Sequence, residues 1–196
     1  MNERAHAAAA QSAPARNLTV CKAIAEALMQ EMRADPTVVV FGEDVASLGG
    51  VFATTQGLLA EFGAARVYDT PISEAAFIGA AVGMATSGLK PVVELMFVDF
   101  VGVCLNSIYN LAAKNCYFSG GAVPVPMVLM TSVGGGYSDA AQHSQCLYAT
   151  FGHLPVLQTA FPLVPTDESA MRPALAGAIV YARNWAVSHP DHHVMV

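Results

Sequence analysis

The amino-acid sequence predicts an α/β fold, with a doubly wound and mainly parallel sheet that carries helices on both faces. The first observation is a β-branched apolar run, Thr37 to Phe41, typical of a strand buried on both faces, which ends in the polar motif Gly42-Glu43-Asp44. The second is repetition, because similar runs follow at 91–96, 125–130 and 157–161 with helical stretches between them. Such sheets bind ligands beyond the carboxyl ends of their strands, so residues just after each run are the first candidates for a site.

The segments before the first strand are assigned in chain order. Residues 1–17 are alanine-rich without apolar periodicity, and we expect a disordered lead-in to a single domain over 18–196. From Thr19 to Arg33 the apolar residues fall on one helical face, which predicts a helix. Asp35-Pro36 ends that pattern.

A strand-turn-helix unit follows the first strand. Arg66 to Tyr68 predicts the end of a short strand, and Pro71 disfavours helix at the residue before it. Ser73 can cap a helix whose first turn holds Glu74. The helix body is built from small residues, which suit the close approach of another backbone or a flat ligand: Gly79, Ala80, Ala81, Gly83 and Ala85. A serine cap before a glutamate also begins many ordinary helices, so spacing alone leaves the role of Glu74 open.

Three later segments complete the predicted elements. Residues 100–116 predict a mostly apolar helix buried against a neighbouring subunit, 166–185 predict another helix, and 192–196 predict a last strand. No group of residues has the spacing of a metal site. Without paired spacing, the cysteines are interpreted as reduced, buried thiols of a cytosolic protein: Cys21, Cys104, Cys116 and Cys146.

The composition limits the classes of partner. Hydrophobic residues make up 54% of the chain and charged residues 12%, about half the usual charged share, so we expect a large permanent protein interface. The formal charge of −6 argues against nucleic acid, which needs a basic face. The longest apolar region, 91–105, is interrupted by two acidic residues and is too short to span a membrane.

Four motifs, in this order and at these separations, carry a resemblance to a known family: Gly42-Glu-Asp44, Asp69-Thr-Pro-Ile-Ser-Glu74, Glu94-Leu-Met-Phe-Val-Asp-Phe100 and Ala141-Gln-His-Ser-Gln145. Together they closely resemble the beta subunit of the E1 component of 2-oxo acid dehydrogenase complexes, the thiamine-diphosphate-dependent pyruvate, branched-chain and acetoin enzymes. The resemblance runs from about Leu18 to Pro155. It implies a transketolase-like pyrimidine-binding domain.

The resemblance also implies roles for particular residues. Glu74 would be the glutamate that hydrogen-bonds and activates the aminopyrimidine of thiamine diphosphate. Glu43 would join the polar network near the cofactor, although a strand-end carboxylate in water is the simpler alternative. His143 would contact substrate at the entrance, or be an ordinary hydrogen-bonded loop residue. The pyrimidine ring would be lined by side chains that otherwise suit a core: Ile72, Met96 and Phe100.

What the resemblance implies for the whole enzyme extends beyond this chain. The diphosphate and Mg²⁺ would sit on an E1 alpha subunit in an α2β2 heterotetramer. That enzyme would decarboxylate a small 2-oxo acid, or cleave acetoin, and pass the acyl group to the lipoyl acyltransferase core. We expect the isolated chain to be inactive, and a cytoplasmic location rather than the mitochondrial matrix.

Two alternatives stay open. A transketolase-like half enzyme would keep the cofactor, although sugar phosphates call for more basic residues than the nine Lys and Arg present. A truncated, non-catalytic interaction subunit is the other alternative, because the family's carboxyl-terminal domain is not found in this sequence.

Overall fold

The structure is a computed structural model that describes residues 18–154, 158–159 and 194–195. Its helical segments are α2 (Val20–Ala34), α3 (Leu58–Phe62), α4 (Glu74–Thr86), η1 (Val98–Phe100), α5 (Val101–Asn106), η2 (Ser107–Ala112), α6 (Asn115–Phe118), η3 (Gly135–Tyr137), η4 (Ala141–His143) and α7 (Tyr148–Gly152). Its strands are β1 (Val38–Gly42), β2 (Val67–Asp69), β3 (Lys90–Phe97), β4 (Val128–Ser132), β5 (Gln158–Thr159) and β6 (Val194–Met195). The predicted lead-in and the predicted 166–185 helix lie outside the described residues.

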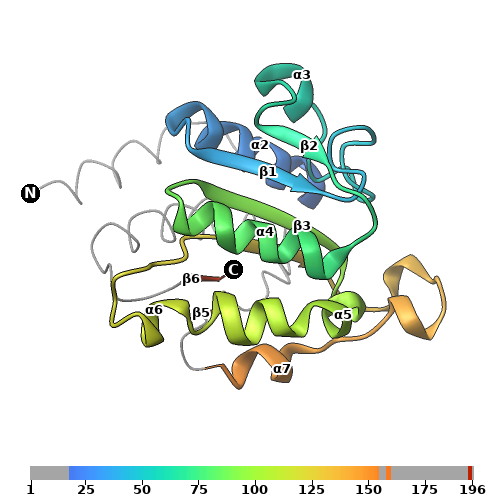
Figure 1. Cartoon of the computed structure of the whole chain (residues 1–196). Helices are drawn as coiled ribbons and strands as arrows, with labels where there is room; N and C mark the ends of the chain where they lie inside the picture. The colour runs from blue at the N-terminus through green and yellow to red at the C-terminus, as the bar shows by residue number, and fades with distance from the viewer. Residues whose placement is uncertain (1–17, 155–157, 160–193, 196) are drawn as a thin grey trace, which may run out of the picture.

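A four-stranded parallel sheet in the order β2-β1-β3-β4 forms the centre of the molecule (Figure 1). The register sets Gly42, the last residue of β1, opposite both Asp69 and Glu94, so three strands bring their carboxyl halves together. The predicted parallel α/β sheet is confirmed. The predicted 157–161 and 192–196 strands are represented by β5 and β6, which pair with each other in a separate two-stranded sheet.

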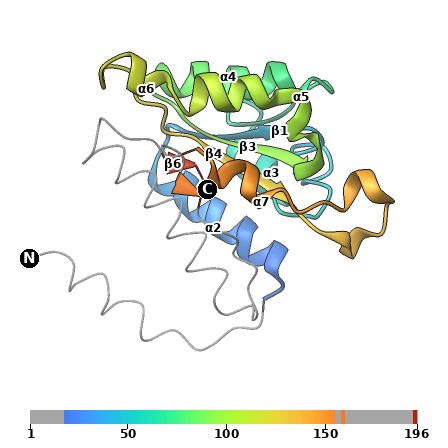
Figure 2. The same cartoon turned by 90° about the horizontal axis from the view of Figure 1, so that it is seen from below.

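Helices cover both faces of the sheet, as Figure 2 shows with α2 on one side and α4 and α5 on the other. Strand alternation explains the two cores, because Val38 and Val40 of β1 face the α2 side while Val39 and Phe41 face the α4 side. The α2 side also holds buried residues of α3 and β2. Each strand is therefore apolar on both faces, as the β-branched runs predicted. Among the described residues, no helix is both long and apolar enough to cross a membrane.

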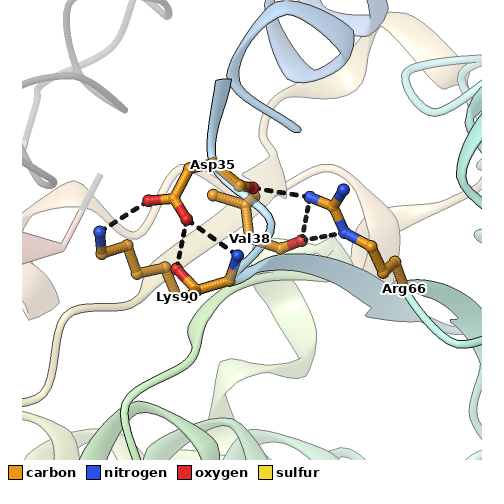
Figure 3. Close-up of polar contacts among 5 residues, drawn as sticks. Asp35, Val38, Arg66 and Lys90 are labelled. Atoms are coloured by element: carbon orange, nitrogen blue, oxygen red, sulfur yellow. Dashed lines mark hydrogen bonds and ion pairs between the residues drawn. The ribbon is translucent and has the colours of Figure 1, made fainter. Parts of the chain in front are cut away.

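A polar clamp ties together the strand ends at the opposite, amino edge of the sheet (Figure 3). The Arg66 guanidinium donates to the backbone oxygens of Val38 (3.0 and 2.8 Å) and Asp35 (2.8 Å). The Asp35 carboxylate accepts from Lys90 Nζ at 2.7 Å and from the Thr37 hydroxyl at 2.6 Å. These contacts join the start of β1 to the residue before β2 and to the first residue of β3.

The predicted 100–116 helix differs from the structure in one respect. Its middle is a π-helix (η2), in which the Ala113 N–H donates to the Ile108 oxygen. Its inner face is buried within this chain, whereas Val103 is 63% exposed, and the predicted burial against a neighbouring subunit stays a prediction. Ser107, buried in η2, donates to the Ala75 oxygen at 3.1 Å and ties this segment to α4.

Two smaller predictions were wrong. Ser73 occupies the N-cap position of α4, but its hydroxyl donates to the Pro71 oxygen at 3.1 Å instead of capping the helix. Cys104 and Cys116 are buried as predicted, whereas Cys146 is exposed and Cys21 is half-buried. Cys146 lies in the long connection between β4 and α7.

Candidate active site at the carboxyl edge of the sheet

Two glutamates from separate elements meet at the carboxyl edge, which lies at the right of Figure 1. Glu43 follows the last residue of β1, and Glu74 is the first residue of the 13-residue helix α4. Burial raises the pKa of Glu43, the negative charge of Glu74 raises it further, and the backbone N–H of Ser73 opposes the rise. The strand and the helix therefore bring the two predicted carboxyl groups within electrostatic reach of each other.

The thiol of Cys104 lies within electrostatic reach of Glu74. Burial raises the pKa of the Cys104 thiol to about 11, and the charge of Glu74 contributes to that rise. Cys104 lies on α5, which packs against α4. A thiol with so high a pKa stays protonated at neutral pH and is a poor nucleophile. Cys104 therefore serves as an apolar neighbour of Glu74.

Buried polar atoms without hydrogen-bond partners mark this edge within the described part of the chain: Glu43 Oε1, Thr70 Oγ1, Glu94 Oε2, Asp99 Oδ2 and Thr131 Oγ1. Each belongs to the carboxyl half of a strand or to residues that follow directly. Buried polar atoms in folded proteins are nearly always hydrogen-bonded, because an orphaned one costs about 1–3 kcal/mol. Their concentration along one edge indicates a surface whose partner atoms come from outside the described residues.

Two carboxyl groups, those of Asp69 and Glu94, hold the connection from β1 to α3 against this edge. Asp69 Oδ1 accepts from the Ala46 N–H at 2.6 Å, and Asp69 also accepts from the Ser47 N–H. Glu94, which is only 3% exposed, accepts from the Thr54 hydroxyl at 3.0 Å. Gly50 packs so tightly here that a Cβ would lie 3.0 Å from Glu94 Oε2.

Phe97, the last residue of β3, is the centre of an aromatic cluster. Its ring centroid lies 5.7 Å from that of Phe100, 4.8 Å from that of His143, and 5.5 Å from those of Phe52 and Tyr137. His143 also meets Phe100 edge-on at 5.4 Å. The cluster therefore joins two predicted site residues, Phe100 and His143, that are 43 positions apart in the sequence.

The hydrogen bond of His143 selects the tautomer of its neutral ring. Nδ1 lies 3.0 Å from the Asp139 backbone oxygen and 3.8 Å from the Asp139 carboxylate, and because a carbonyl can only accept, the bond at Nδ1 requires the proton there. Neutral His143 therefore leaves its Nε2 lone pair available as a base or hydrogen-bond acceptor. The side chain is 21% exposed, so the imidazole is shielded by the rings but still reached by solvent.

The two remaining predicted residues are less constrained. Ile72 is 85% exposed in the loop between β2 and α4, and Met96 is half-buried near the end of β3. Both lie at the same edge as the glutamates. Their contact with a pyrimidine ring stays a prediction.

Sequence reasoning did not single out three residues that organise this edge: Phe97, Asp99 and Glu94. All three lie within the 94–100 motif, where alternation along β3 could have marked Glu94 as a buried acid. No signal of that kind exists for Asp99, because its partner, the Gln145 N–H at 3.2 Å, is 46 residues away.

This chain is similar to known proteins of one family. Residues 16–188 match the family model for the transketolase pyrimidine-binding domain. The beta subunit of acetoin:2,6-dichlorophenolindophenol oxidoreductase from Cupriavidus necator is 44% identical over 167 residues, covering 80% of this chain and 49% of that protein. The pyruvate dehydrogenase E1 component subunit beta of Rhizobium meliloti is 40% identical over 188 residues, covering 91% and 41%.

A solved structure shares the fold. The inactive β4 tetramer of a split-gene transketolase superposes with a TM-score of 0.64 at 21% identity, covering 92% of this chain and 51% of that one. This chain thus spans about half the length of the relatives that it matches.

Proposed function

Because this chain belongs to the family of transketolase pyrimidine-binding domains, we propose that it is the beta-subunit domain of a thiamine-diphosphate-dependent 2-oxo acid dehydrogenase. The beta subunits of acetoin- and pyruvate-oxidising enzymes among its relatives support this assignment over the transketolase-like alternative. The substrate would be a small 2-oxo acid or acetoin, with the acyl group passed to a lipoyl acyltransferase core.

The main observation behind this proposal is that Glu74 and Glu43 come together at the carboxyl edge of the sheet, where buried polar atoms lack hydrogen-bond partners among the described residues. We assign Glu74 to hydrogen-bond the aminopyrimidine and to share its proton. Glu43, whose pKa is raised by burial and by Glu74, would lie beside it in the polar network near the cofactor. When bound, thiamine diphosphate supplies the electron sink for decarboxylation.

The remaining side chains of the edge fit a flat heterocycle and a small substrate. Met96 and Phe100 offer a polarizable sulfur and an aromatic face, and Ile72 projects from the loop before α4. In the neutral ring, whose proton the bond at Nδ1 requires, His143 Nε2 is suited to accept a hydrogen bond or a proton from substrate. These residues bind, orient and shield, while Glu74 and His143 move protons.

We further propose that an alpha subunit completes the site in an α2β2 assembly and holds the diphosphate and Mg²⁺. The orphaned atoms support this, because they need partners that the described residues do not supply. The isolated chain would then be inactive.

The test compares the native chain with Glu74→Gln, each co-purified with the candidate alpha subunit, in decarboxylation of pyruvate and of a branched 2-oxo acid and in acetoin cleavage. We expect Glu74→Gln to lower kcat by about 10²–10⁴-fold, because the amide cannot share a proton with the pyrimidine ring. Thiamine diphosphate titration of the same complexes reports whether the variant still binds the cofactor.

The matched control is Glu61→Gln, which neutralises an exposed carboxylate of α3 that pairs with Arg33. It should retain native activity. Full activity in Glu74→Gln would refute the assigned role. A native complex that binds neither the alpha subunit nor thiamine diphosphate would favour the non-catalytic alternative.

A further inference from the structure

The segment after β4 forms a loop whose neck is held by the backbone of one residue, Gln145. The Gly134 N–H donates to the Gln145 oxygen at 3.0 Å, and the Gln145 N–H donates to Asp99 Oδ1 at 3.2 Å. The Gln145 residue is thus held through its carbonyl by its own loop and through its N–H by the turn that follows β3. His143 lies two residues before this anchored position.

The backbone inside the loop needs such an anchor. Ser138 and Ala140 both have positive φ values, +63° and +60°, which cost free energy in residues other than glycine. The Ser144 hydroxyl donates to the Ala140 oxygen at 2.7 Å, and His143 Nδ1 bonds the Asp139 oxygen, so the loop is tied mainly to itself. A strained conformation of this kind persists only where the surrounding structure holds it.

The 3-10 turn η1 supplies contacts to the loop from three neighbouring side chains. Phe97 precedes the turn and Phe100 ends it, and both rings meet the His143 imidazole edge-on. Asp99, between them, provides the acceptor for the Gln145 N–H. Its other oxygen, Oδ2, is buried and has no hydrogen-bond partner among the described residues.

We propose that Asp99 is a positioning residue for His143: it fixes the neck of the 134–145 loop and so holds the imidazole against Phe97 and Phe100 with Nε2 available. This inference rests on the proposed function, in which His143 Nε2 serves the substrate. Asp99 itself acts through the backbone of Gln145, whereas the aromatic rings contact the imidazole and do not hold the neck of the loop.

The first test needs neither cofactor nor partner. Amide hydrogen exchange of the full chain is followed at Gln145 and Gly134 by NMR in the native protein, Asp99→Ala and Asp99→Asn. We expect Asp99→Ala to speed exchange at both amides by about tenfold or more, because the charged acceptor is lost. Asp99→Asn keeps an acceptor oxygen and should remain within about threefold of native. An unchanged rate in Asp99→Ala overturns the proposal.

The second test is a double-mutant cycle in the assembled enzyme, with Asp99→Ala, His143→Gln and the two combined. If Asp99 acts through His143, its removal lowers kcat in the native background and has little further effect once His143 is gone. Losses that multiply would overturn the proposal. Asp99→Asn should recover most of the activity lost in Asp99→Ala, which a purely electrostatic role would not allow.

The activity of Glu74→Gln and the amide exchange of Asp99→Ala together distinguish failure of the proposed function from failure of this inference. If Glu74→Gln keeps full activity while the Gln145 amide is released in Asp99→Ala, the cofactor assignment fails and the anchoring stands. Glu61→Gln, which removes a carboxylate from the exposed α3 pair, should change neither the exchange rates nor the activity.

Discussion

Carboxyl groups around this sheet have very different affinities for protons. Burial alone would raise the pKa of Asp35, but bonds from Lys90 and Thr37 outweigh it and lower the pKa to about 2. Asp69 is likewise kept ionised by the N–H groups of Ala46 and Ser47. Glu94 lacks such donors, so burial raises its pKa to about 7 despite the bond from Thr54. The ionised pair stabilises turns, whereas Glu94 is a buried acid that titrates near neutral pH.

Glu94 is therefore expected to make the stability of the fold depend on pH. A carboxyl group whose pKa rises from 4.5 to about 7 on folding stabilises the native state below pH 4.5 and loses that contribution as the pH rises to about 7. The native chain should lose about 3 kcal/mol of unfolding free energy over this window relative to Glu94→Gln, which keeps an acceptor for Thr54. Urea unfolding of both proteins at pH 5 and pH 8 measures the difference. A constant difference between the two pH values would show that Glu94 does not titrate there.

At the scale of elements, the sequence predicted what local pattern decides. The helix expected over Thr19 to Arg33 is α2, with Thr19 as its cap, and the 37–41 run is β1, shifted by one residue. The break in the 100–116 helix was not predicted; there Ser107 bonds the Ala75 oxygen of another helix, a tertiary contact that a local pattern does not encode. The failed cap at Ser73 has a similar origin, since its hydroxyl bonds locally to Pro71.

The amino-edge clamp gives an element-scale prediction. Arg66→Met removes every side-chain donor to the Val38 and Asp35 oxygens and also the cation–π contact with Phe62. We expect the free energy of unfolding to fall by about 2–4 kcal/mol, because buried carbonyls are left without a charged donor. Thermal or urea unfolding measures the loss.

The chain offers a matched control for this clamp. Arg33→Met removes an arginine whose side chain is 56% exposed and pairs with Glu61 of α3 at the surface, so its effect should be small. Arg66→Lys keeps the charge without the fork of donors and should fall between native and Arg66→Met. Equal effects of Arg33→Met and Arg66→Met would contradict the structural importance of the clamp.

At the scale of the whole molecule, the two edges of one sheet have opposite properties. The amino edge is closed by satisfied hydrogen bonds around Asp35 and Arg66, whereas the carboxyl edge carries orphaned polar atoms and an anchored, strained loop. The sequence predicted that the motifs gather at the carboxyl edge, because they follow the strands. It did not predict how the edge is held, since the bond of Asp99 to Gln145 and the contacts of Phe97 join distant segments.

This asymmetry predicts a pattern of hydrogen exchange measured by mass spectrometry. β1 and β3 pair on both sides and are covered by two cores, so their amides should exchange about a hundredfold more slowly than those of the edge strand β2 and of 133–147. If the carboxyl edge receives its missing partner atoms from an alpha subunit and cofactor, their addition should protect peptides around Glu43, Glu74 and 133–147. Peptides around Asp35 and Arg66, whose polar groups are already satisfied, should not change. Protection gained equally at both edges would indicate general stiffening of the fold instead of a site completed at one edge.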